Sequence, residues 1–400
     1  MKSTGIVRGI DALGRIVLPK ELRTNLRLDT DTKLEIFVDG DAIVLKKHPP
    51  AAAISAARWM SLRCSLRATA SARPAAARSA RCNSHKGGSL MSPMIDFTVP
   101  STVPGRTLHA FRCVPEGEVR AVLQLSHGMV EFIDRYRPLA EYLADRGILV
   151  TGHDHLGHGA SIRTKEDYGY FAEPDGNRAV LADLHAVTVL TKELYPNLPY
   201  FLLGHSMGSF YARQYLCEYG RELDGAIIMG TGFQPKALVQ FAKTTCRVLA
   251  AFHGWHYRSN LVANLSFMGY NKGLEGRTTH DWLNRDQAEV DKYLAEERCT
   301  FTFTLNAYYS MFSGILRLHD PAFLARMPKD LPLLFLSGDA DPVGEQGKGV
   351  RRAIQSLKDA GVQNIESIFY PGARHELLVE TNHQEVFQDI GDWLEKQLSR

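Results

Sequence analysis

The chain has 400 residues, enough for two to three domains of ordinary size, which excludes a peptide or a small disulfide-stapled module. Its net charge of +3 is unevenly distributed, because residues 1–48 carry +2, residues 49–94 carry +7 and residues 95–400 carry −6. Only the middle segment is strongly basic, so the chain as a whole is not a dedicated nucleic-acid-coating protein.

The spacing of the cysteines and the length of the apolar runs indicate in which cellular compartment the protein is expected. Six cysteines show no CxxC pair and no repeated spacing, which predicts unpaired thiols in a reducing environment. No apolar stretch approaches the roughly 18 residues of a spanning helix. The sequence therefore predicts a cytoplasmic protein without integral membrane association.

Residues 1–48 have the pattern of a small β module. Short strands are expected at 5–10, 14–18, 33–38 and 42–46, and a short helix at 20–28. The turn Asp39-Gly40-Asp41 between the last two strands is a hairpin signal. Fewer than 50 residues cannot bury a stable core alone, so this module is expected to form a homodimer.

The segments STGIVRGIDALGRIVLPKELR and LEIFVDGDAIVLKK resemble the AbrB-type (SpoVT-AbrB) DNA-binding domain of bacterial transition-state regulators. The resemblance implies a swapped-hairpin dimer that binds DNA through Arg8, Arg15 and Arg23. Gly9 and Thr24 stand where further basic residues are expected, which implies weaker and more salt-sensitive binding. The alternative interpretation is that these arginines only solvate a strand face.

Residues 49–94 are rich in Pro, Ala, Ser and Arg and contain no acidic residue, which is typical of a disordered basic linker. A second hypothesis is that a fusion artefact or a real gene fusion joined two unrelated parts here. Lys86-Gly87-Gly88 can be encoded by a run that resembles a bacterial ribosome-binding site, and Met91 follows shortly after it. Codons at 86–88 that do not resemble a ribosome-binding site would reject the fusion hypothesis.

From residue 95 the chain alternates apolar strands with helical patterns, which predicts an α/β fold with a mostly parallel sheet. In such sheets ligands bind beyond the carboxyl ends of the strands. The expected strands are 121–125, 148–152, 200–204, 225–229, 333–337 and 366–370.

The sequence Gly204-His205-Ser206-Met207-Gly208 lies between an expected strand and a helix at 209–218. This context is that of a nucleophile elbow, a tight turn that lifts a serine hydroxyl clear of the sheet. Ser206 is therefore the candidate nucleophile.

A serine nucleophile needs a base, and the base needs a carboxylate that fixes its tautomer. His375 follows the last expected strand, and Asp341 follows the strand before it, so the order Ser…Asp…His is that of α/β hydrolases. Asp339 is the rival acid. The backbone N–H groups of Met207 and Met129 are the candidate oxyanion-hole donors.

One motif suggests a different chemistry. His153-Asp154-His155-Leu156-Gly157-His158 nearly spells the HxHxDH zinc motif of metallo-hydrolases, but Gly157 occupies the position that needs Asp. The same stretch matches the DHxGHGxS turn of monoacylglycerol-lipase-like proteins, where it is structural. The sequence favours the structural role, and no metal or cofactor is expected.

Together HGM at 127–129, DHLGHG, YFLLGHSMGS, GDADPV and YPGARHE resemble the monoacylglycerol lipase and lysophospholipase branch of α/β hydrolases over residues 95–400. The resemblance implies an α/β-hydrolase fold with a helical cap at 233–320 and hydrolysis of single-chain lipid esters through an acyl-enzyme. Aromatic residues crowd the cap, where they either line an acyl tunnel or form its own core. An amide or a short ester as substrate stays open, as does a DNA-binding regulator whose hydrolase-like half senses a ligand.

Overall fold

The computed structural model describes residues 34–39, 42–47 and 93–399. The chain divides into two compact units, residues 1–80 and 81–400. Arg8, Arg15, Arg23, the expected helix at 20–28 and most of the predicted linker lie outside the described residues.

The first unit contains a hairpin. Strands β1 (Leu34–Asp39) and β2 (Ala42–Lys47) pair in antiparallel register, with Asp39 opposite Ala42. This pairing confirms the hairpin that the turn Asp39-Gly40-Asp41 predicts.

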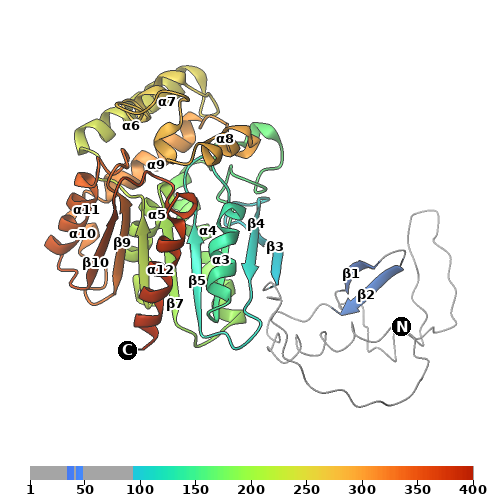
Figure 1. The fold of residues 1–400 in the computed structure, drawn as a ribbon. Coiled ribbons are helices and arrows are strands. Elements are labelled where there is room, and N and C mark those ends of the chain that lie inside the picture. Colours follow the sequence, from blue (N-terminus) through green and yellow to red (C-terminus); the bar gives the residue numbers. More distant parts are fainter. Residues whose placement is uncertain (1–33, 40–41, 48–92, 400) are drawn as a thin grey trace, which may run out of the picture. The chain divides into compact units, whose positions relative to one another are not determined.

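The second unit is built on one mixed sheet of eight strands in the order β10-β9-β8-β7-β5-β6-β4-β3 (Figure 1). Six of them form its parallel part: β5 (Ala121–Ser126), β6 (Ile148–His153), β7 (Tyr200–His205), β8 (Gly225–Met229), β9 (Leu333–Gly338) and β10 (Ile365–Tyr370). Each lies within one residue of its predicted bounds. Strands β5, β6, β7, β8 and β9 are nearly continuous apolar runs because they are buried on both faces, whereas β10 is an edge strand and is largely exposed or half-buried.

Two further strands were not predicted. β3 (Met94–Pro100) and β4 (Thr107–Cys113) form an antiparallel hairpin, and β4 pairs antiparallel with β6. Exposed residues interrupt β3 and give it no continuous apolar run, because it is the edge of the sheet. β3 begins at Met94, one residue before the predicted start of the hydrolase domain.

Helices cover both faces of the sheet (Figure 1). α3 (Arg137–Ala144) and α12 (His383–Leu398) bury apolar side chains in one core cluster. α4 (Gly176–Leu194), α5 (Met207–Tyr219) and α11 (Lys348–Asp359) contribute to the other. Strand β7 supplies Phe201 and Leu203 to the first cluster and Leu202 to the second, as the alternation of a strand requires.

The chain between β8 and β9 is largely helical and forms the cap. Its helices are α6 (Lys236–His253), α7 (Asn260–Ser266), α8 (Gln287–Ala295) and α9 (Leu305–Arg317), and the short α10 (Pro321–Leu324) leads back to the sheet. Single 3-10 turns occur at Ile133–Tyr136, Lys165–Asp167, Gly220–Glu222, Asp281–Leu283, Glu297–Cys299 and Leu377–Val379. Figure 1 shows α6, α7 and α8 above the sheet.

None of the helices in the described parts of the chain combines the length and the apolar character needed to cross a bilayer. In the same parts the four cysteines, Cys113, Cys217, Cys246 and Cys299, are free thiols and buried.

Candidate active site

Ser206 occupies a sharp turn between β7 and α5. Its backbone has φ 52° and ψ −120°, a conformation that residues with side chains rarely adopt. A β-carbon at Gly204 would collide with the Gly208 carbonyl, and one at Gly208 would collide with the Ser126 carbonyl. Both glycines are therefore needed for the close approach of the turn to α5 and β5. Because Ser206 is the N-cap, α5 begins at Met207, two residues before its predicted start.

Three side chains from separate loops form a hydrogen-bonded chain. His375 Nε2 lies 2.8 Å from Ser206 Oγ, and His375 Nδ1 lies 2.9 Å from Asp341 Oδ2. Asp341 is fully buried, and its other oxygen accepts the Val343 N–H at 2.8 Å. Asp339 is exposed and accepts the Gly372 N–H at 2.6 Å instead. The structure thus places Asp341 at the imidazole and Asp339 away from it.

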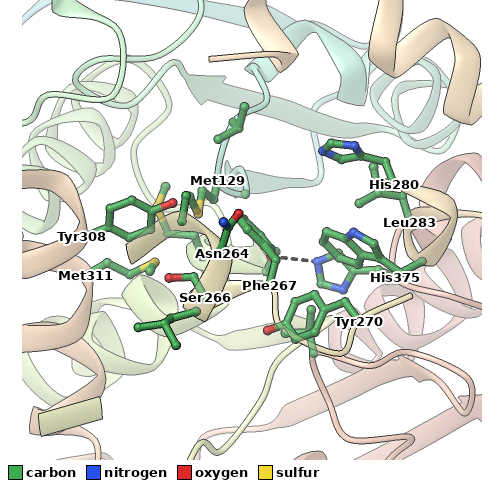
Figure 2. Close-up of a pocket in the computed structure, with 18 of the residues that line it drawn as sticks. Met129, Asn264, Ser266, Phe267, Tyr270, His280, Leu283, Tyr308, Met311 and His375 are labelled. Carbon is green, nitrogen blue, oxygen red and sulfur yellow. Dashed lines mark hydrogen bonds between the residues drawn. The ribbon is translucent and has the colours of Figure 1, made fainter. Parts of the chain in front are cut away.

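A cavity of about 1040 Å³ opens above Ser206 between the sheet and the cap. Figure 2 shows Met129, Tyr308 and Met311 on one side of it and Tyr270, His280 and His375 on the other. The aromatic residues of the cap do not all serve one of the two expected roles, because Phe252 and Tyr257 are exposed and lie outside the cavity lining. Seven of the cap's aromatic residues line the cavity: Phe241, Phe267, Tyr270, Trp282, Phe301, Tyr308 and Phe312.

The loop after β5, residues 127–131, is called here the oxyanion loop. His127 Nε2 accepts the His155 N–H at 2.9 Å, so His127 Nδ1 carries the proton and donates to the Gly128 carbonyl at 2.8 Å. In a trans peptide the C=O and the N–H point in opposite directions, so fixing the Gly128 carbonyl also orients the N–H of Met129. That N–H has no acceptor among the residues that the structure describes. Met129 and Met207 both line the cavity beside Ser206.

Glu131, the last residue of the oxyanion loop, carries a buried carboxylate. Its Oε1 accepts hydrogen bonds from the Gly128 N–H and, at 2.9 Å, from the Tyr136 hydroxyl. The same oxygen lies 3.1 Å from His205 Nδ1. Burial alone would raise the pKa of Glu131, but the hydrogen bond and the charge of His205 lower it below its ordinary value. The carboxylate is therefore ionised at neutral pH.

His205 precedes Ser206 and bridges two loops. Burial alone would lower its pKa, but the hydrogen bond and the charge of Glu131 raise it. The Nε2 of His205 lies 3.3 Å from the His375 carbonyl oxygen, which can only accept. A doubly protonated imidazole satisfies both contacts.

A second ion pair adjoins the first. Arg135 contacts Glu376 at 2.5 and 2.8 Å and Glu131 at 3.2 Å. Glu376 follows His375 directly, so charged side chains connect the oxyanion loop, the serine turn and the histidine loop. None of these charged residues stands out in sequence, because only the fold brings them together.

In the zinc-like motif at 153–158, the side chains of His155 and His158 make hydrogen bonds to other protein groups. His155 Nε2 lies 3.0 Å from Ser126 Oγ, and His158 Nε2 accepts the Val130 N–H at 3.3 Å. Burial lowers the pKa of His153 and that of His158 to about 3. The imidazoles of His153 and His158 are thus neutral, and that of His158 supports the oxyanion loop through its bond to Val130.

Within the described residues, one group of side chains is spaced closely enough to hold a metal: Asp96, His109 and Asp134. The guanidinium of Arg137 already contacts these two carboxylates at 2.5 and 2.7 Å. The guanidinium of Arg137 therefore already supplies the positive charge that pairs with these carboxylates.

Comparison with known proteins identifies the families to which the two parts of the chain are similar. The family "Serine aminopeptidase, S33" matches residues 117–382, and "Antidote-toxin recognition MazE, bacterial antitoxin" matches residues 10–52. Monoglyceride lipase of Mus musculus is 30% identical over 299 residues, which cover 71% of this chain and 86% of that protein. The transition state regulatory protein AbrB of Bacillus subtilis is 56% identical over 50 residues, which cover 12% of this chain and 52% of AbrB.

Among solved structures, a thermostable carboxyl esterase from Bacillus coagulans in complex with glycerol superimposes with a TM-score of 0.71. It is 24% identical, and the match covers 76% of this chain and 99% of that one, so it shows the shared α/β-hydrolase fold. The chain belongs to the serine aminopeptidase S33 family of α/β hydrolases, within which it is monoglyceride-lipase-like, and it carries an AbrB/MazE-type domain at its N-terminal end.

Proposed function

We propose that this protein is a serine carboxylester hydrolase that acts on single-chain lipid esters, monoacylglycerols or lysophospholipids. Ser206 attacks the ester carbonyl while His375 takes its proton, and Asp341 holds the imidazole in the required tautomer. The alcohol leaves with that proton, and water then hydrolyses the acyl-enzyme through the same base. The Met129 and Met207 amides stabilise the oxyanion in both steps.

The observation that carries this proposal is the position of His375 between Ser206 and Asp341, at 2.8 and 2.9 Å, on the floor of a cavity. A nucleophile and a base within hydrogen-bond reach, with the base oriented by a buried carboxylate, is the arrangement that acyl transfer requires.

The cavity supports a lipid substrate. Its walls toward α6 and α9 include Val239, Ala242, Met311, Phe312 and Ile315. A volume of about 1040 Å³ is at the upper end of small-molecule pockets, and apolar walls suit an acyl chain. The similarity to monoglyceride lipases favours the same substrate class.

The proposal is tested with monoacylglycerol and a short aryl ester, using the full chain and its Ser206→Ala variant. A fluorophosphonate probe reports covalent labelling of the serine. We expect hydrolysis and labelling in the parent protein and the loss of both in the variant. Hydrolysis that survives the substitution would reject Ser206 as the nucleophile. A parent protein with neither activity nor labelling would favour the alternative of a ligand sensor.

A panel of esters and amides distinguishes the remaining substrates. A lipid esterase prefers long acyl chains, whereas equal rates from two carbons upward, or faster amide cleavage, would assign the same three residues to a short-chain esterase or a peptidase.

We also propose that the AbrB/MazE-type domain binds DNA as a dimer. The similarity to AbrB and the β1–β2 hairpin favour this assignment. In the full chain, replacing all three of Arg8, Arg15 and Arg23 by Ala should weaken DNA binding. The slope of log affinity against log salt concentration should become shallower by about one unit for each lost phosphate contact. Affinity unaffected by the triple substitution would reject these residues as the DNA contacts.

A further inference from the structure

The oxyanion loop contains a residue in an unfavourable conformation. Val130 has φ 56°, a left-handed backbone that a β-branched residue adopts only when its surroundings enforce it. Val130 is buried, so water does not stabilise its backbone groups. Its conformation must therefore be held by hydrogen bonds from within the protein.

Two side chains supply those bonds from opposite directions. His158, below the loop, accepts the Val130 N–H at 3.3 Å. Tyr293, on cap helix α8, donates its hydroxyl to the Val130 carbonyl at 2.8 Å. The second bond joins the cap directly to the residue after Met129.

The position of Tyr293 is itself well fixed. Its side chain is buried, and the guanidinium of Arg135 lies 5.1 Å from the centre of its ring. Close by, the guanidinium of Arg298 lies 3.6 Å from the ring centre of Phe132. The cap thus meets the oxyanion loop through one hydrogen bond, and it meets Phe132 and Arg135, which follow the loop, through two cation–π contacts.

We propose that Tyr293 is a positioning residue through which the cap holds the oxyanion loop in its catalytic conformation. The inference rests on the proposed function, in which the Met129 N–H stabilises the oxyanion. A rotation of the 129–130 backbone would turn that N–H away from the reacting carbonyl. Tyr293, which also lines the cavity, therefore acts on the transition state through the oxyanion loop, and displacement of α8 would switch the site to a less active state.

The test compares Tyr293→Phe with Tyr309→Phe in the full chain, with p-nitrophenyl butyrate as a short substrate. Tyr309 is a half-buried tyrosine on cap helix α9 that does not line the cavity, and its ring centre lies 5.1 Å from that of Trp255. Tyr293→Phe should lower kcat about 10-fold with KM within about twofold, a smaller effect than loss of an oxyanion donor. The rate of fluorophosphonate labelling should fall in parallel. Tyr309→Phe should leave both rates within about twofold of the parent.

A double-mutant cycle with Val130→Gly separates positioning from a purely structural role. Glycine adopts positive φ without strain, so the loop should no longer depend on the tyrosine. In the Val130→Gly background, Tyr293→Phe should lower kcat less than about threefold. Additive effects, a normal kcat in Tyr293→Phe, or an equal loss in Tyr309→Phe would each overturn the inference. A parent protein inactive on every ester would instead overturn the proposed function and, with it, this inference.

Discussion

The carboxylate of Glu131 lies 3.1 Å from the imidazole of His205, directly beneath the turn that carries Ser206. Both side chains are buried, and their pKa shifts favour the charged form of each. Because His205 also reaches the His375 carbonyl, this ion pair connects the oxyanion loop with the serine turn and the histidine loop.

Glu131→Gln should therefore affect both stability and activity. The amide keeps the size of the side chain but leaves the charge of His205 without its partner, whereas Arg135 keeps its contacts to Glu376. Breaking a buried pair in this way costs about 3 kcal/mol of unfolding free energy. The Gly128 N–H also loses a charged acceptor, so kcat on a short ester should fall at least about 10-fold. Urea unfolding and steady-state kinetics measure the two effects.

Asp183→Asn is the matched control. Asp183 is also buried, and it accepts hydrogen bonds from Ser101 and Thr102, which lie outside the cavity lining. Asp183→Asn should lower the free energy of unfolding and leave kcat within about twofold of the parent value. If Glu131→Gln behaves in the same way as this control, the ion pair has no role in organising the active site.

Asp341→Asn should lower kcat by about 10⁴, because the amide favours the wrong tautomer of His375. Asp339→Asn changes a neighbouring carboxylate that contacts the Gly372 N–H, so its kcat should stay within a fewfold of the parent. Burst kinetics with a p-nitrophenyl ester give both values. The reverse ranking would show that Asp339 is the catalytic acid.

Acid should destabilise the fold through its buried neutral histidines. His153 has a pKa of about 3 in the folded protein and an ordinary value near 6.5 when unfolded, so between these pH values the unfolded chain binds more protons. The free energy of unfolding therefore decreases as pH falls from 6.5 toward 3, by up to about 1.4 kcal/mol per pH unit for each such histidine.

His153→Leu should flatten this dependence. Neither ring nitrogen of His153 has a hydrogen-bond partner within the described chain, so leucine removes a titrating group without breaking a bond. The control Leu184→Ala truncates a buried apolar side chain and should lower stability equally at every pH. Urea titrations from pH 4 to pH 7 provide the comparison, and parallel curves for the parent and His153→Leu would contradict the assignment.

The cavity wall on α6 should determine the acceptable acyl length. Ala242→Phe places a ring in the cavity and should lower kcat/KM at least about 10-fold for long-chain monoacylglycerols while sparing a butyrate ester. Ala251→Phe adds the same ring to the exposed side of that helix and should leave kcat/KM unchanged for both substrates. Equal losses on both substrates would place the acyl chain elsewhere.

Much of this arrangement follows from local sequence. Buried parallel strands such as β7 are continuous apolar runs, and the elbow around Ser206 has glycines at fixed positions, so both are readable without a structure. The edge strand β3 escaped prediction because exposed residues break its apolar pattern. The bond from Tyr293 to Val130 joins positions 163 residues apart, and no local pattern marks either residue.

The cap enters the chain between two strands that are directly paired, with Ala226 of β8 opposite Leu333 of β9. Backbone hydrogen bonds fix that register whatever the connecting chain contains. Changes in the cap can therefore alter the substrate range while the distances among Ser206, Asp341 and His375 are preserved, provided that they keep Leu283, whose carbonyl accepts the N–H of Glu376 at 2.8 Å. Chemistry and selectivity are thus separable modules in this fold, and a transplanted cap needs a hydroxyl at the position of Tyr293 to retain the connection between them.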